Sequence, residues 1–275
     1  MGDLHWTTSL SFTTADGIRI RGYDLVQLIG RVPFPSVLYL LYTGELPEPR
    51  YARLIDAIMV ASIDHGAGAP SALAARTTAS GGAPLGAAAA AGLLTLGKFH
   101  GAVVQDAMEA IQQVADKAGE QGLDAAADAV VAAWRKAGRR LSGFGHRQHK
   151  RKDPRLERLF ALAHEADVPG AYLQAAQAIE AALKRSTGKD LPINVDGAIA
   201  AILCEIKFPP TLSNALFMVA RLTGILAHAN EEMTKMPPMR RIDPVDFSYA
   251  GPADRELPEV GRTVSSPNQD EQAAH

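Results

Sequence analysis

The order of hydrophobic and polar positions along the chain is mainly helical. After residue 23, apolar residues recur three and four positions apart in one segment after another, as amphipathic helices require. Proline and glycine residues separate these segments, as expected at helix ends. The pattern predicts helices over residues 23–29, 36–42, from 47 through 59, 71–80, 85–96, 99–117, 123–137, 153–165, 170–184, from 192 to about 206, and from 212 to about 233.

The N-terminal part has a different pattern. Residues 18–21 alternate Ile-Arg-Ile-Arg with period two, and Asp16-Gly17 precedes them. Alternation indicates a strand, and Asp-Gly is a strong turn signal. We therefore predict a short β-hairpin over residues 9–22. The fold class that follows is all-α with a small N-terminal hairpin.

Residues 68–97 are unusually rich in Ala, Gly, Ser and Thr. Alanine is the best helix former, and small side chains let helices approach closely. Such helices suit a buried core or a subunit interface. A flexible linker is the alternative, because Gly/Ser-rich stretches are often unstructured.

Composition narrows the class of protein. A chain of 275 residues that is 47% hydrophobic can bury a full core, as one large or two small domains. Its formal charge of −2 gives no bulk reason to bind nucleic acid or an anionic membrane. The single cysteine, Cys204, excludes a disulfide within the chain and fits a reducing compartment.

The sequence indicates neither secretion nor membrane insertion. The first six residues lack the basic start and apolar run of a signal peptide. No stretch reaches the ~20 apolar residues that a membrane-spanning helix needs. We therefore expect a cytoplasmic protein.

Residues 143–155 carry the densest candidate chemistry. Gly143 and Gly145 bracket an aromatic residue and set His146 on a tight bend, and a run of cations follows up to Lys152. Glycine permits close backbone approach, and N–H groups on such a bend attract anions. Asp153-Pro154 suits the start of a helix. The stretch is typical of an anion-binding loop with an acid/base at its centre.

Two other interpretations of this loop carry less weight. His146 and His149 are three residues apart, but two imidazoles without further ligands make a poor metal site. The basic run resembles a solvated face or a nucleic-acid patch. The overall charge and the lack of interleaved aromatic residues argue against nucleic acid.

The other candidates each have an ordinary structural explanation. His65 would interact with the C-terminal end of its helix, and His100 would be a partly buried polar residue. Asn194 or Asp196 would be an N-cap. Arg221 would be a helix-surface arginine.

As a set, the candidates are more informative. Three imidazoles, one carboxylate and two arginines suit chemistry on a small polycarboxylate. Arginines bind carboxylates bidentately, and histidine and aspartate move protons near neutral pH. Sequence alone leaves open whether they converge. The set comprises His65, His100, His146, Asp196, Arg155 and Arg221.

Three motifs in this order resemble the citrate synthase superfamily. They are Gly143-Phe144-Gly145-His146, Asp153-Pro154-Arg155 and Asn194-Val195-Asp196. His65, His100 and Arg221 also fall in the expected order and approximate spacing. The resemblance covers roughly residues 18–252, and its motifs are specific in combination.

The chain departs from full-length citrate synthases in two places. Ser62 stands where they usually carry a second histidine, three residues before the match to His65. In citrate synthases, an arginine that precedes a proline near the C-terminus reaches the substrate of the neighbouring subunit. Here the segment 243–252 has no arginine before its proline, and Arg240 or Arg241 would be the substitute. This ending and the short chain look more like citryl-CoA lyase and the C-terminal module of ATP-citrate lyase.

The resemblance implies an activity and an assembly. The activity is citryl-CoA lyase, cleaving citryl-CoA to acetyl-CoA and oxaloacetate. The alternatives are citrate synthase or a related acyl-CoA condensing enzyme, and a non-catalytic CoA-binding subunit of a larger lyase. A homodimer or higher homo-oligomer is implied, without nucleic-acid or membrane partners.

The resemblance also implies domains that close over the substrate. The large helical domain would comprise residues 1–103 and 207–275, with a mobile tail after about 252. A small domain at 104–206 would carry His146 and Asp196.

Site roles follow from the same resemblance. No metal and no permanently bound cofactor is implied, since coenzyme A enters as part of the substrate. The catalytic residues would be His100, His146 and Asp196; the substrate-binding residues His65, Arg155 and Arg221; and the CoA-binding residues Gly143, Gly145 and Lys150.

Overall fold

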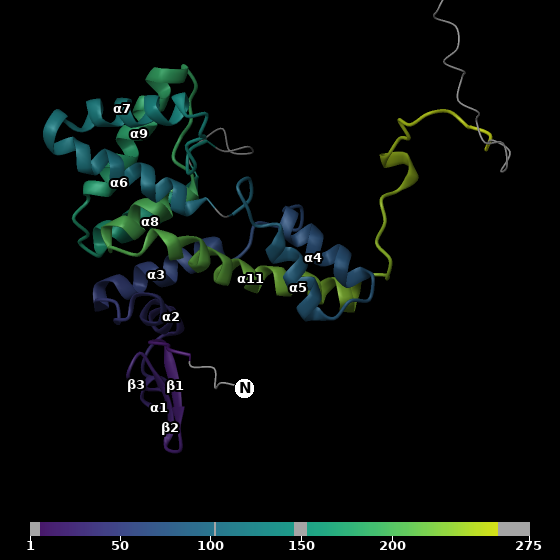
Figure 1. Ribbon diagram of the computed structural model, residues 1–275, viewed down its shortest axis with the longest axis horizontal. Coiled ribbons are helices and arrows are strands. Elements are labelled where there is room, and N and C mark those ends of the chain that lie inside the picture. Colours follow the sequence, from purple (N-terminus) through teal and green to yellow (C-terminus); the bar gives the residue numbers. More distant parts are fainter. Residues whose placement is uncertain (1–5, 102, 146–152, 258–275) are drawn as a thin grey trace, which may run out of the picture. The chain divides into compact units, whose positions relative to one another are not determined.

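The structure is a computed structural model that describes residues 6–101, 103–145 and 153–257. It divides into two compact units, Met1–Met239 and Arg240–His275. The first unit is helical, with a small sheet near the N-terminus (Figure 1). The predicted fold class is therefore confirmed.

The sheet contains the predicted hairpin. Strands β1 (Ser11–Thr14) and β2 (Gly17–Ile20) pair antiparallel, and the turn between them, Ala15-Asp16, leads directly into Gly17. A third strand, β3 (Tyr23–Asp24), pairs with β2 where a helix from residue 23 was predicted. Asp24 explains the difference, because its side chain accepts from Val26 N and caps α1 (Leu25–Leu28). The helix therefore begins only after Asp24.

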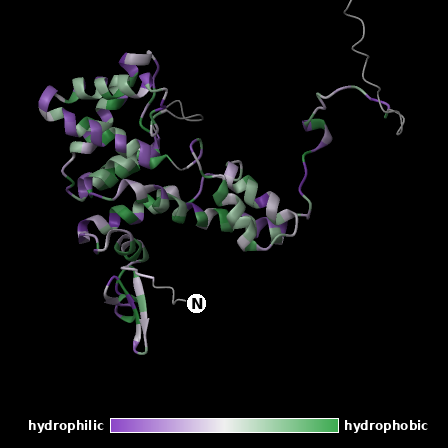
Figure 2. Ribbon diagram, viewed as in Figure 1, coloured by the Kyte–Doolittle hydropathy of each residue, from purple (hydrophilic) through white to green (hydrophobic). Residues whose placement is uncertain are grey.

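The larger hydrophobic core surrounds α10 (Val195–Glu205). Ten of the eleven residues of this helix are buried, so it is covered on all sides. The helices α6 (Val104–Gln121), α8 (Pro154–Glu165) and α9 (Ala171–Thr187) contact it. Helix α7 (Leu123–Lys136) packs on α6 and α9. These surrounding helices mix hydrophobic and hydrophilic residues along their length, as partly exposed helices do (Figure 2). The core continues into α2 (Phe34–Thr43) and α3 (Pro49–Ser62).

A second, smaller core joins α4 (Pro70–Ser80), α5 (Leu85–Leu94) and α11 (Pro210–Lys235). Small residues let these backbones approach closely. A Cβ on Gly92 would lie 2.6 Å from Ile225 Cγ2 and 2.9 Å from the Ser71 carbonyl oxygen. The predicted close packing of small-residue helices is confirmed, and the linker alternative is wrong.

An ion-pair cluster reinforces the smaller core. Arg76 on α4 donates to Glu232 at 2.8 Å and to Glu231 at 3.0 Å on α11. Arg76 and Glu232 are both buried. Removing one partner of such a pair leaves a buried charge without compensation, so the cluster fixes α4 against α11.

Within the described residues, α11 is the helix that is long and apolar enough to cross a membrane. The expectation that no segment reached that length was wrong for these 26 residues. The helix packs against α3, α4, α5, α6 and α10, as a core helix does.

The start of α6 corrects another prediction. The sequence pattern placed His100 on a helix beginning at residue 99, but α6 begins at Val104. Residues 97–100 form a tight turn, with Gly97 N donating to His100 O at 2.8 Å and His100 N to Gly97 O at 2.9 Å. Gly101 follows with a φ of +79°, and a Cβ there would lie 2.6 Å from Phe217 Cε1. Only glycine fits, so the helix cannot extend back to His100.

The second unit is described from Arg240 to Leu257. It contains one short helical turn, η1 (Pro244–Asp246), capped by Asp243. Most of the tail predicted to be mobile after about residue 252 lies outside the described residues. The predicted boundaries at 103/104 and 206/207 stay predictions, although residues 104–206 correspond to α6 through α10.

Helix α10 meets the loop at Gly143 without an intervening side chain. A Cβ on Gly197 would lie 2.3 Å from the Gly143 carbonyl oxygen, and a Cβ on Gly143 would lie 2.8 Å from Gly197 Cα. Both obstacles are backbone atoms, which cannot rotate away. This contact sets the distance between the loop and the start of α10.

We expect Gly197→Ala to lower the free energy of unfolding by about 1–3 kcal/mol, because overpacking forces the backbone to move. Gly119→Ala in α6 is the matched control, since a Cβ there meets nothing within 4 Å. That control should stabilise the protein by about 0.5–1 kcal/mol. Urea unfolding of the two variants checks the prediction, and equal midpoints would contradict it.

Candidate functional site

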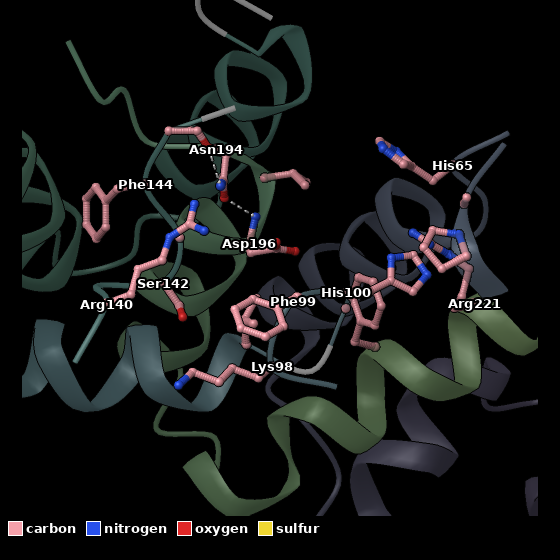
Figure 3. Close-up of a pocket in the computed structure, with 18 of the residues that line it drawn as sticks. His65, Lys98, Phe99, His100, Arg140, Ser142, Phe144, Asn194, Asp196 and Arg221 are labelled. Atoms are coloured by element: carbon pink, nitrogen blue, oxygen red, sulfur yellow. Dashed lines mark hydrogen bonds between the residues drawn. The ribbon is translucent and has the colours of Figure 1, made fainter. Parts of the chain in front are cut away.

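A cleft of about 430 Å³ lies in the first unit and gathers most of the candidate residues (Figure 3). Its lining comes from segments far apart in the sequence. One side consists of the loop 140–145 with the starts of α8 and α10. The other consists of the loop at His65, the turn 98–101 and the middle of α11.

Asn194 joins the loop 143–145 to α10. Its Oδ1 caps the helix by accepting from Asp196 N at 2.9 Å and Gly197 N at 3.2 Å. Its Nδ2 donates to Gly145 O at 2.9 Å, and its backbone N donates to Gly143 O at 3.0 Å. The N-cap interpretation of Asn194 is therefore confirmed. One side chain sets both the helix start and the loop.

Gly145 has less freedom to bind an anion than its sequence context predicted. Its N–H donates to Pro192 O at 2.7 Å. Phe144 forms a backbone bridge with Ile193 and is buried. A phosphate approaching this bend would therefore have to use groups other than the Gly145 amide.

Asp196 is in the first turn of α10, and its carboxylate points toward the side that carries His65, His100 and Arg221 (Figure 3). Burial raises the pKa of this carboxyl above its usual value, and Asp153 adds to the rise. Arg155 and Arg221 oppose the shift but do not cancel it. Asp196 is therefore suited to hold a proton at a higher pH than an exposed aspartate does.

Arg155 is held at the start of α8. Asp153, which is 2% exposed, caps the helix through Arg155 N. Its two oxygens accept from Arg155 Nε at 3.1 Å and from a terminal guanidinium nitrogen at 2.8 Å. The helix start at Asp153-Pro154 was predicted correctly. A bidentate pair of this kind fixes the direction of a guanidinium group.

Arg221 is not the surface arginine that its sequence context favoured. It is 4% exposed, and its Nε donates to Ser62 O at 2.8 Å. Its guanidinium carbon lies 4.9 Å from the centre of the Phe217 ring. Burial lowers the pKa of Arg221, with Arg155 adding to the effect and Asp64 and Asp196 opposing it. A desolvated guanidinium such as this one binds carboxylates strongly.

His100 is held in one orientation by the start of α4. Its Nε2 lies 3.3 Å from Ser71 N and 2.9 Å from Ser71 Oγ. A backbone N–H can only donate, so Nε2 accepts and the ring proton of neutral His100 is on Nδ1. Burial lowers the pKa of His100, and the nearby Arg221 and His65 lower it further. The ring is therefore kept neutral with a single N–H to donate.

Seven of the nine predicted site residues lie together in this cleft. His65, His100, Arg155, Asp196, Arg221, Gly143 and Gly145 all line the cleft. His146 and Lys150 lie outside the described residues, so their assignments stay predictions. Ser62, where synthases usually carry a histidine, is buried and is not among the lining residues.

Sequence reasoning missed several lining and supporting residues. Lys98, Phe99, Arg140 and Phe217 also line the cleft. Ser71 sets the His100 tautomer across 29 positions, a contact that no local pattern predicts. The sequence context of Asn194 indicated an N-cap, but no local pattern indicated its hydrogen bonds to the loop.

The arrangement can perform proton chemistry on an anionic substrate. Arg155 and Arg221 supply positive charge, and Asp196 supplies an acid with a raised pKa. His100 supplies a neutral N–H donor for an oxygen on which negative charge develops. These groups suit enolate chemistry next to a carbonyl.

Comparison with known proteins gives the family. Residues 47–242 match the family of the citrate synthase C-terminal domain. "Putative citrate synthase 2" of Mycobacterium tuberculosis is 32% identical over 196 residues, covering 70% of this chain and 50% of that protein. The citrate synthase of Haloferax volcanii is 31% identical over 220 residues, covering 77% and 55%. The chain thus spans about half the length of the curated relatives that it matches.

Solved structures add a whole-chain match. The citryl-CoA lyase of Hydrogenobacter thermophilus has a TM-score of 0.84 and 37% identity, covering 92% of this chain and 97% of that one. A mutant ATP citrate lyase of Methanosaeta concilii, solved with (3S)-citryl-CoA, has a TM-score of 0.78 and 23% identity. It covers 92% of this chain and 43% of the lyase, and at that identity it shows the fold alone. By sequence match and fold, this chain belongs to the citrate synthase family.

Proposed function

We propose that the protein is a citryl-CoA lyase that cleaves citryl-CoA to acetyl-CoA and oxaloacetate. The observation that carries this proposal is the match to the Hydrogenobacter thermophilus citryl-CoA lyase over nearly the full length of both chains. Ser62, which is buried, stands where citrate synthases usually carry a histidine, and this difference also favours cleavage over synthesis. The raised pKa of Asp196 and the neutral N–H donor of His100 in the cleft also support the proposal.

Citrate synthase is the second candidate. It is favoured by the names of the curated relatives, including those of Mycobacterium tuberculosis and Haloferax volcanii. The two activities share an enolate step, so the same groups serve either direction. They differ in whether citryl-CoA is cleaved at a carbon–carbon bond or hydrolysed at its thioester.

The proposal assigns substrate binding to the charged side of the cleft. Arg155 and Arg221 bind carboxylates of the citryl group, and His65 donates to its oxygens. Asp153 holds Arg155 in place, and Ser62 O holds Arg221. These anchored guanidinium groups lose little freedom on binding, which favours a defined substrate orientation.

Cleavage begins at the citryl hydroxyl group. His146 removes the proton from the citryl hydroxyl, the carbon–carbon bond breaks, and the hydroxyl carbon becomes the ketone of oxaloacetate. The electron pair of the broken bond passes to the acetyl-CoA enolate, whose oxygen accepts from His100 Nδ1–H. Asp196 gives its proton to the enolate carbon. The raised pKa of Asp196 supports this role, because the residue must hold a proton before cleavage.

Coenzyme A enters as part of the substrate in this proposal. Gly143, Gly145 and Lys150 are proposed to contact it, as are Lys98 and Arg140 at the cleft. The Gly145 N–H is already bonded, so the cationic side chains bind the phosphates. A homodimer or higher homo-oligomer and a cytoplasmic location complete the proposal.

One experiment separates the candidate activities. The purified protein is incubated with citryl-CoA, and separately with acetyl-CoA plus oxaloacetate, while oxaloacetate and free CoA are followed. Oxaloacetate release without free CoA is expected. Rapid free-CoA formation from the second mixture would replace the proposal with citrate synthase. No turnover in either mixture would point to a non-catalytic CoA-binding subunit.

His100→Ala tests the enolate donor. Because a donor of this kind acts mainly in the transition state, we expect kcat to fall by about 10²–10³-fold with a smaller change in KM. His164→Ala is the matched control, since His164 is exposed at the end of α8. Steady-state kinetics with citryl-CoA measures both. A change confined to KM would contradict the role.

Asp196→Asn tests the proton donor through two readouts that move in opposite directions. We expect kcat to fall by more than about 10²-fold, because an amide cannot deliver the proton. Stability should rise near neutral pH, because folding takes the wild-type carboxyl from water, where it ionises freely, into a site that disfavours its charge.

The pH dependence of that gain has a defined sign. The pKa of Asp196 is raised on folding, so the folded state binds this proton more tightly than the unfolded chain. Wild-type stability therefore falls as pH rises from about 4 through the folded pKa. The advantage of Asp196→Asn should grow over this window and be absent below it. Urea unfolding at several pH values measures it, and a pH-independent difference would refute the assignment.

A further inference from the structure

The segment 62–66, which carries His65 into the cleft, lies along one face of α11. Three residues of the helix contact it: Arg221, Gly224 and His228. These positions are three and four residues apart, so they fall on one side of the helix. The segment is therefore aligned with α11 over two turns.

Two of these contacts hold the backbone. Arg221 Nε donates to Ser62 O at 2.8 Å. One turn further on, a Cβ on Gly224 would lie 2.4 Å from Ile63 O and 3.1 Å from Asp64 Cβ. The loop backbone thus lies directly against the helix backbone at Gly224. These contacts fix the backbone position of residues 62 and 63, but they do not determine the orientation of residues 64–66.

The third contact holds a side chain next to His65. His228 Nε2 lies 3.1 Å from Asp64 Oδ1. The other oxygen of Asp64 accepts from Gly66 N at 3.1 Å. The Asp64 carboxylate therefore connects to α11 on one side and closes the turn around His65 on the other.

The electrostatics of Asp64 agree with this geometry. Burial alone would raise its pKa, but hydrogen bonds from the N–H groups of Gly66 and His65 and the His228 ring outweigh burial, and the pKa is lowered. An ionised carboxylate only accepts, so His228 Nε2 carries the proton. The bond therefore exists with the His228 ring neutral or charged.

From these contacts we infer that His228 is a positioning residue: through Asp64 it holds His65 in the orientation that binds the substrate's oxygens. The identity of the substrate in this inference rests on the proposed function, whereas the geometry at Asp64 is independent of it. The His228 and Asp64 side chains are 17% and 41% exposed. Because the Asp64 partner is this exposed, solvent screens the pair and the pair adds little to global stability. The effect of losing His228 should consequently appear at His65 rather than in the unfolding of the protein.

A double-mutant cycle tests the coupling. His228→Ala is expected to lower kcat/KM for citryl-CoA about tenfold, because a small misplacement of a binding group is costly. In a His65→Ala background the same change should matter less than about twofold, because the positioned group is gone. His228→Gln keeps a donor at the position of Nε2 and should restore activity to within about threefold.

Asn230→Ala is the matched control on α11, since Asn230 is exposed and lies two residues from His228. It should leave kcat/KM unchanged in both backgrounds. The inference is overturned if His228→Ala stays within about twofold of wild type. It is also overturned if His228→Ala costs as much with His65 absent as with it present.

Hydrogen exchange provides a readout that does not need activity. The Gly66 amide donates to Asp64, so its exchange reports whether the turn is closed. His228→Ala should speed exchange in residues 62–66 at least fivefold without shifting the urea midpoint, and Asn230→Ala should not. If wild type does not turn over citryl-CoA, the proposed function fails while this measurement still decides the positioning role. Unchanged exchange would then overturn it.

Discussion

The site depends on a place where two backbones touch. Gly143 and Gly197 meet with no side chain between them, and Asn194 bonds the same loop and the same helix. This contact puts Asp196 in the first turn of a helix that is otherwise entirely in the core. Since α10 is buried on all sides, the core fixes the acid far more rigidly than a loop would.

The charges in the cleft depend on one another. Asp196 has a raised pKa although two arginines oppose the rise, and Arg221 is buried with two carboxylates that oppose its shift. Arg155 is already paired with Asp153. The cleft is therefore built so that each charge is compensated in part by protein, and the residual positive charge is available to an anionic substrate. That balance is what distinguishes a binding cleft from a structural ion-pair cluster such as Arg76 with Glu231 and Glu232.

The sequence predicted the elements well where a local physical signal was present. Asp16-Gly17 specified the hairpin, and Asp153-Pro154 specified the start of α8. Prediction from the sequence failed where residues distant in the chain determine the local structure. The start of α6 depends on Phe217, which leaves no room for a Cβ at Gly101. The burial of Arg221 and the tautomer of His100 likewise depend on contacts across many residues. Motif order identified seven of the residues that line the cleft, but only tertiary packing showed the others and what holds each one.

Helix α11 takes part in both hydrophobic cores. Leu216 belongs to the larger core, Ile225 and Ala229 to the smaller one, and Phe217 and Arg221 line the cleft along the same helix. A continuous helix cannot lose its C-terminal half without freeing the backbone next to Arg221. The smaller core therefore cannot melt as an independent unit that leaves the cleft intact. Cavities or charges introduced among α4, α5 and α11 would disturb the cleft and lower local stability together, so the cooperative unit that carries the cleft is larger than the cleft itself.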